Sequence, residues 1–103
     1  MDRITRIKKM EECLNVSEKA LDRATEALDE LEKSMKAFDK LSKYYGSTLW
    51  MSDFEADEAG KLPEDLKRGV LSEDAAYNVI VGYRDMTVRM MRIAATLTEN
   101  VLM

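Results

Sequence analysis

The sequence of 103 residues contains no histidine, one cysteine and one proline. Without histidine, the chain lacks the usual proton-transfer group at neutral pH and the commonest metal ligand. Cys13 alone cannot form an intrachain disulfide, which fits a reducing compartment, so we expect a cytoplasmic protein. Thiol catalysis is not expected either, because no histidine is present to activate Cys13. The sequence therefore predicts a protein that is not an enzyme and that needs no cofactor.

An excess of negative charge is confined to the middle of the chain. The net charge at neutral pH is −4, and residues 44–75 carry eight acids against three bases. The segments on either side are balanced to within one charge. An acidic protein without a long apolar run is a poor match for nucleic-acid phosphates or for a membrane. We therefore expect neither as a partner.

Residues 1–45 have the pattern of one long amphipathic helix. Apolar residues recur with alternating spacings of three and four, and neither glycine nor proline interrupts them before Gly46. In a heptad numbering the a positions are Ile7, Leu14, Leu21, Leu28, Met35 and Ser42, and the d positions are Met10, Ser17, Ala24, Leu31, Phe38 and Tyr45. Small residues at g, such as Cys13, Ala20 and Ala27, widen the stripe beyond the seam of a two-stranded coiled coil.

A second helix is predicted for residues 72–102, with Ser72 as its N-cap. Its core stripe would contain Ala76, Val79, Tyr83, Met86, Met90, Ile93 and Leu97. Further apolar residues, including Val81, Val88 and Leu102, fall on the opposite side. A helix that is apolar around most of its circumference is normally covered on several sides. Either the middle insert or a second subunit must cover this one.

These patterns predict one all-α domain over residues 1–103. Two long antiparallel helices would be joined by an ordered insert of short helical turns at residues 46–71. We expect a homodimer, most simply a four-helix bundle with the second helices at its centre, and a possible further protein partner. The predicted interaction surface consists of Tyr44, Tyr45, Trp50, Phe54, Val81, Val88, Met91 and Leu102. Aromatic residues in such positions more often cover the end of a helical core.

Capping and turn residues give a local prediction for the insert. Gly46 is expected to end the first helix in a left-handed conformation. Ser52 and Glu55 have the spacing of a capping box, which predicts a short helix from Ser52 that ends at Gly60. Pro63 is expected to begin another helical turn, closed by Gly69.

The insert also resembles a known family. The segments that carry the resemblance are 44–47, 53–63 and 65–74, together with Trp50 and Tyr77. They are similar to a family of small bacterial proteins described as domain of unknown function 4298. The resemblance extends over nearly the whole chain, with only a helical pattern to match in the first 43 residues. The resemblance implies a bacterial, cytoplasmic protein. It implies no particular activity.

A divalent-cation or small-ligand site in the insert is the alternative function. Its donors would be Asp53, Glu55, Asp57, Glu58 and Glu64. If Asp53 is position 1 of a calcium loop, oxygen donors fall at positions 1, 3, 5 and 12. However, position 6, where such loops need glycine, is Glu58, and Lys61 at position 9 would repel a cation. Acids near the start of a short helix explain the same residues without a ligand.

Overall fold

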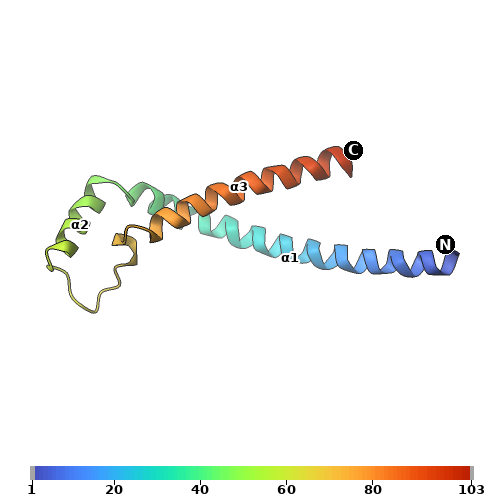
Figure 1. Cartoon of the computed structure of the whole chain (residues 1–103), viewed down its shortest axis with the longest axis horizontal. Helices are drawn as coiled ribbons and strands as arrows, with labels where there is room; N and C mark the ends of the chain where they lie inside the picture. Colours follow the sequence, from blue (N-terminus) through green and yellow to red (C-terminus); the bar gives the residue numbers. More distant parts are fainter. Residues whose placement is uncertain (1, 103) are drawn as a thin grey trace. The chain divides into compact units, whose positions relative to one another are not determined.

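The protein is helical in a computed structural model that describes residues 2–102. Three α-helices and a short 3-10 helix follow one another along the chain, and no strand occurs among the described residues (Figure 1). The all-α prediction is therefore confirmed. The chain divides into two compact units, residues 1–38 and 39–103.

Helix α1 spans Arg3–Tyr44 and agrees with the predicted limits to within two residues. The Asp2 carboxylate caps its start by accepting a hydrogen bond from the Thr5 amide at 2.7 Å. This bond lowers the pKa of Asp2 below its usual value, because it stabilises the charged form. The first unit consists of this helix alone, and no residue of α1 is buried. A single helix cannot form a core of its own, so its apolar stripe needs a partner element.

Gly46 ends α1 as the sequence predicts. Its φ of 77° lies in the left-handed region, which glycine reaches without steric cost. The Ser47 amide then donates to the Tyr44 carbonyl at 3.0 Å, which tightens the turn. Helix α2 begins directly after this turn.

Helix α2 spans Thr48–Glu58, and the prediction that it begins at Ser52 is wrong. Ser47 is the N-cap, with an extended ψ of 170°, and its hydroxyl accepts a hydrogen bond from the Trp50 amide at 3.1 Å. Ser47 follows the left-handed glycine directly, so it is the first residue able to cap a new helix. The predicted end of this helix at Gly60 is confirmed, since Gly60 has a φ of 70° and the Lys61 amide returns to the Ala56 carbonyl at 3.0 Å.

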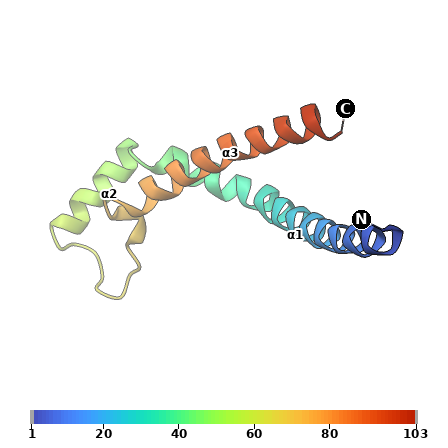
Figure 2. The same cartoon turned by 45° about the vertical axis from the view of Figure 1, so that its right-hand side comes forward.

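The segment after α2 forms a loop that projects from the helix in two views (Figures 1 and 2). Pro63 begins a turn closed by the Leu66 amide at 3.2 Å, and the predicted helical turn at this proline is not formed. A 3-10 helix, η1, follows at Gly69–Leu71. The chain stays irregular up to Arg68 because contacts with α2, described below, hold this segment.

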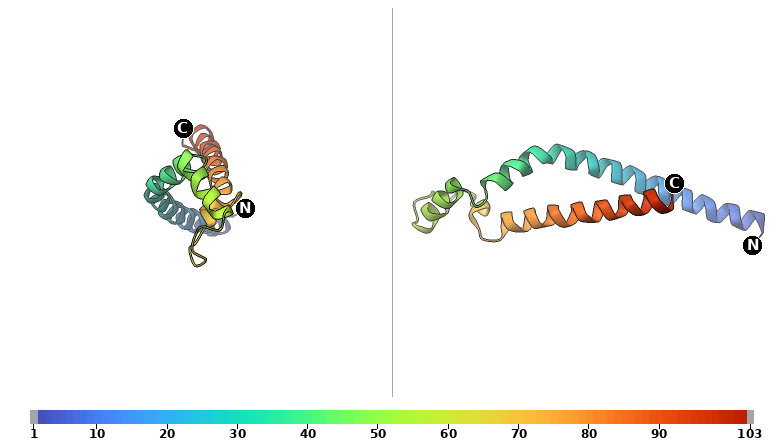
Figure 3. Two further views of the ribbon diagram at one scale, coloured as in Figure 1. Left: turned by 90° about the vertical axis from the view of Figure 1, so that its left-hand side faces the viewer. Right: turned by 90° about the horizontal axis from the view of Figure 1, so that it is seen from above.

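Helix α3 spans Ala75–Asn100 and appears as one uninterrupted helix (Figure 3). It begins three residues after the predicted cap, yet Ser72 acts at this end. Its hydroxyl accepts from the Ala75 amide at 3.2 Å and donates to the Gly69 carbonyl at 2.7 Å. The buried residues of the described chain are Trp50, Leu71 and Ala76, so the small core lies where α2, η1 and the start of α3 meet.

Candidate interaction surface

Trp50 is the centre of the folded insert. Its ring stacks on Phe54 with centroids 5.3 Å apart and meets the edge of Tyr45 at 5.1 Å. Its indole Nε1 donates a hydrogen bond to the Val70 carbonyl oxygen at 2.9 Å. A buried tryptophan needs a partner for this N–H, and η1 supplies it. Tyr45, Trp50 and Phe54 of the predicted interaction surface are thus assembled into one cluster, with Trp50 buried and its two neighbours half-buried.

The two tyrosine hydroxyls connect the end of α1 to the rest of the second unit. The Tyr44 hydroxyl donates to the Asp53 carboxylate on α2 at 2.6 Å. This hydrogen bond raises the pKa of Tyr44, because it requires the phenol to keep its proton beside a negative charge. The Tyr45 hydroxyl donates to the Glu73 carbonyl oxygen at 3.4 Å, a longer and weaker contact.

Asp57 pairs with Arg68 of the loop. The Arg68 Nη1 donates to the Asp57 carboxylate at 2.9 Å, and about a third or less of each side chain is exposed. A partly shielded charge pair of this kind orients the loop against α2.

The acids of the alternative cation site are spread around α2. Asp53, Glu55, Asp57 and Glu58 belong to the helix, and Glu64 lies in the turn after Pro63. Carboxylates on successive helical residues point in different directions, whereas a calcium loop wraps its donors around one ion. Between residues 2 and 102, no group of three or more His, Cys, Asp or Glu side chains is placed to hold a metal ion.

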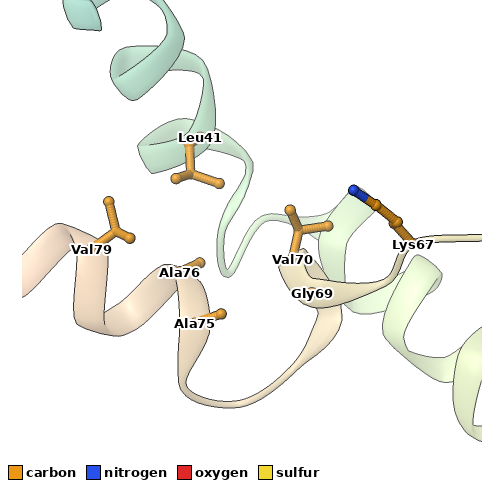
Figure 4. Close-up of a pocket in the computed structure, with 7 residues that line it drawn as sticks. All are labelled: Leu41, Lys67, Gly69, Val70, Ala75, Ala76 and Val79. Atoms are coloured by element: carbon orange, nitrogen blue, oxygen red, sulfur yellow. The ribbon is translucent and has the colours of Figure 1, made fainter.

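A shallow apolar pocket of about 350 Å³ lies beside η1 (Figure 4). Leu41 from the end of α1 and Val79 from α3 face Val70 across it. The complete lining is Leu41, Lys67, Gly69, Val70, Ala75, Ala76 and Val79. Lys67 is the one charged member of this lining, so the pocket suits an apolar group.

The predicted surface residues in and just after α3 are more exposed to solvent than the aromatic cluster. Val81 is half-buried and Val88 is exposed. Met91 is 60% exposed, and Leu102, which was predicted on this helix but lies two residues beyond its end at Asn100, is 76% exposed. Val79, Ile93 and Leu97, on the predicted core stripe of the same helix, are also exposed. Much of the apolar circumference of α3 is therefore not covered by the rest of the second unit.

Sequence reasoning did not identify three contributors to this region. Ser47 could have been recognised as a cap, because a serine directly after a helix-ending glycine is a common start signal. No local sequence pattern indicates that Arg68 pairs with Asp57. None indicates that the Val70 carbonyl accepts the Trp50 N–H. Both contacts join residues more than ten positions apart, which sequence spacing does not report.

Comparisons with known proteins identify the family of this chain but no activity. A protein-family model described as "Domain of unknown function (DUF4298)" matches residues 7–93. The match includes most of α1, the whole insert and the greater part of α3. Neither a curated protein nor a solved structure matches the chain. Within the described chain, no helix is long and apolar enough to cross a membrane.

Proposed function

Because the chain belongs to the DUF4298 family, whose description names no activity, we propose a function from its own surfaces. The protein is a non-enzymatic helical module that forms a homodimer and acts through protein–protein interaction. The exposed apolar circumference of α3 is the observation that carries this proposal. Val88 and Met91 lie on a different side of α3 from Val79, Ile93 and Leu97, and all five are exposed.

The energetic argument depends on the apolar area that water would otherwise contact. Burial of such surface yields about 25 cal/mol per Å², and burial of one Leu, Met or Ile side chain yields about 1.5–3 kcal/mol. Within the second unit, α3 packs on η1 through its first turn, where Ala76 is buried. The remaining turns of α3 have several residues of this size uncovered. A second subunit is the simplest source of cover, because pairing two copies removes the same apolar surface from water on each of them.

The same face explains how a further protein could bind. A helix that exposes methionine and branched side chains can adapt its packing to another amphipathic helix. The apolar pocket beside η1 continues this surface at the start of α3 through Ala76 and Val79. An additional partner would therefore bring an apolar helical face of its own.

Light scattering coupled to size-exclusion chromatography tests the dimer directly. The full chain should have twice the monomer mass from low to high micromolar concentration. The double variant Val88→Ser/Met91→Ser should shift the mass toward the monomer, because two exposed apolar contacts are lost. Arg92→Ser is the matched control, since Arg92 lies on the polar row of α3 and should leave the mass unchanged. A wild-type chain that stays monomeric at high micromolar concentration would overturn the proposal.

A further inference from the structure

The first four turns of α1 expose a row of apolar residues. Ile4, Ile7, Met10 and Leu14 are each between 50% and 67% exposed. They lie in the first unit, which is a single helix and offers no second element of its own. Whatever covers them must come from another part of this chain or from another molecule.

The lengths of the helices exclude complete cover by α3. Helix α1 has 42 residues and helix α3 has 26, which correspond to about 63 Å and about 39 Å. The start of α3 lies beside the end of α1, because Val79 of α3 and Leu41 of α1 line the same pocket. If α3 followed α1 from the level where Val79 lies beside Leu41, its last residue, Asn100, would reach only about residue 20 of α1. Ile4, Ile7 and Met10 would then still be uncovered.

The charges beside the apolar row restrict what can lie on it. In the heptad numbering with Ile7 at a, the e positions after Ile7 are Glu11, Glu18, Thr25, Glu32 and Asp39. The g positions up to the same point are Arg6, Cys13, Ala20, Ala27 and Ser34. One edge of the row is therefore acidic, and the other edge begins with a base and continues with small residues.

These edges favour a second copy in one orientation. In an antiparallel pair the e positions of the two helices face each other, so Glu11 would face no base. In a parallel, in-register pair, each g position faces the e position five residues later on the partner. Arg6 would then face Glu11 of the partner subunit, and no like charges would meet along the g–e edges. The chain is thus complementary to itself in the parallel arrangement.

We infer that the N-terminal four turns of α1, residues 3–16, pair with the same segment of a second copy as a parallel, in-register coiled coil. Ile7, Met10 and Leu14 form the layers, and Arg6 pairs with the partner's Glu11 on both edges. Arg3, the first helical residue, occupies a d position, so the apolar layers begin only after it. This inference rests on the proposed self-association and adds to the α3 surface a second interface with a defined orientation. Exposed ion pairs contribute little affinity, so the charges select the orientation and the apolar layers supply the binding.

A charge-exchange experiment tests the pairing between chains. Arg6→Glu and Glu11→Arg should each raise the dimer dissociation constant about tenfold, because each replaces two attractions by two repulsions. Mixing the two variants should restore wild-type affinity, since position 6 of each chain then faces the opposite charge at position 11 of the other. Lys19→Glu, at a heptad position away from the seam, is the control and should leave the constant unchanged. Sedimentation equilibrium measures all of these constants.

Disulfide trapping tests the register. In a Cys13→Ser background, Leu14→Cys places one thiol at the same layer of each helix. Oxidised glutathione should then link the two chains rapidly, because a parallel, in-register pair brings these positions within disulfide distance. Val16→Cys, on the outer side of the same helix, should link slowly.

The outcomes separate the two proposals. A monomeric wild-type chain would overturn both of them. A wild-type dimer that ignores the charge exchange and links no faster through position 14 than through position 16 would overturn the coiled coil alone, and self-association through α3 would stand.

Discussion

The indole Nε1 of Trp50 and the carbonyl oxygen of Val70 are joined by a 2.9 Å hydrogen bond across 20 positions of the chain. Trp50 belongs to α2 and Val70 belongs to η1, so this bond fixes the returning loop against the helix. The same ring stacks on Phe54 and meets Tyr45. One side chain therefore connects the end of α1, the body of α2 and the start of the segment that leads into α3.

Trp50→Phe should lower the free energy of unfolding by about 1–3 kcal/mol. The smaller ring keeps part of the aromatic packing, but it leaves the Val70 carbonyl without its donor. Chemical denaturation followed by circular dichroism measures the change. Leu49→Ala is the control, because Leu49 is exposed and should change the stability by less than about 0.5 kcal/mol. Equal stability of the two variants would show that the tryptophan does not organise the insert.

Ser47→Ala should destabilise the protein by about 1 kcal/mol. The substitution removes the hydroxyl that accepts the Trp50 amide at the start of α2. Ser52→Ala should have no such cost, since Ser52 lies inside α2 and alanine favours a helix. Thermal unfolding of the two variants measures the difference. A larger loss at Ser52 than at Ser47 would contradict the observed start of this helix.

Gly46→Ala and Gly82→Ala should change stability in opposite directions. Gly46 has a φ of 77°, where a Cβ atom is unfavourable, so alanine should cost about 1 kcal/mol. Gly82 lies inside α3 with open space where a Cβ atom would lie, so alanine should stabilise the helix by about 1 kcal/mol. Denaturant midpoints measure both changes. Stabilisation by Gly46→Ala would exclude the left-handed turn.

The Tyr44 phenol should titrate above the ordinary tyrosine pKa of 10.0, because its proton is held by Asp53. A pKa raised in the folded state means that the contribution of this bond is complete below pH 10 and is lost as the pH rises through the folded pKa. Ultraviolet titration of phenolate should show a transition above the ordinary tyrosine value, and Tyr44→Phe should remove it. Asp53→Asn should shift that transition toward the ordinary value. Tyr77→Phe should leave it in place. An unchanged titration curve in Tyr44→Phe would contradict the assignment.

The extent of the long helices was predictable, because it depends on residues close in sequence. The apolar period without breakers gave Arg3–Tyr44 to within two residues, and Gly46 and Gly60 both have the positive φ expected of helix-ending glycines. The course of the insert was less predictable. Ser52 and Glu55 fit a capping box, yet Ser47 is the cap, because the turn at Gly46 makes the earlier serine available.

Local sequence by itself determined which segments are helical and where glycine stops them, since helix formation depends on contacts within about four residues. It also determined the acidic insert and the self-complementary edges of α1, which are properties of composition and spacing. Only the tertiary structure decided that Trp50 donates to Val70, that Arg68 pairs with Asp57, and that the turn at Pro63 is not a helix. These two side-chain contacts join residues 20 and 11 positions apart, and such pairing is selected by packing of the completed chain and not by any local preference.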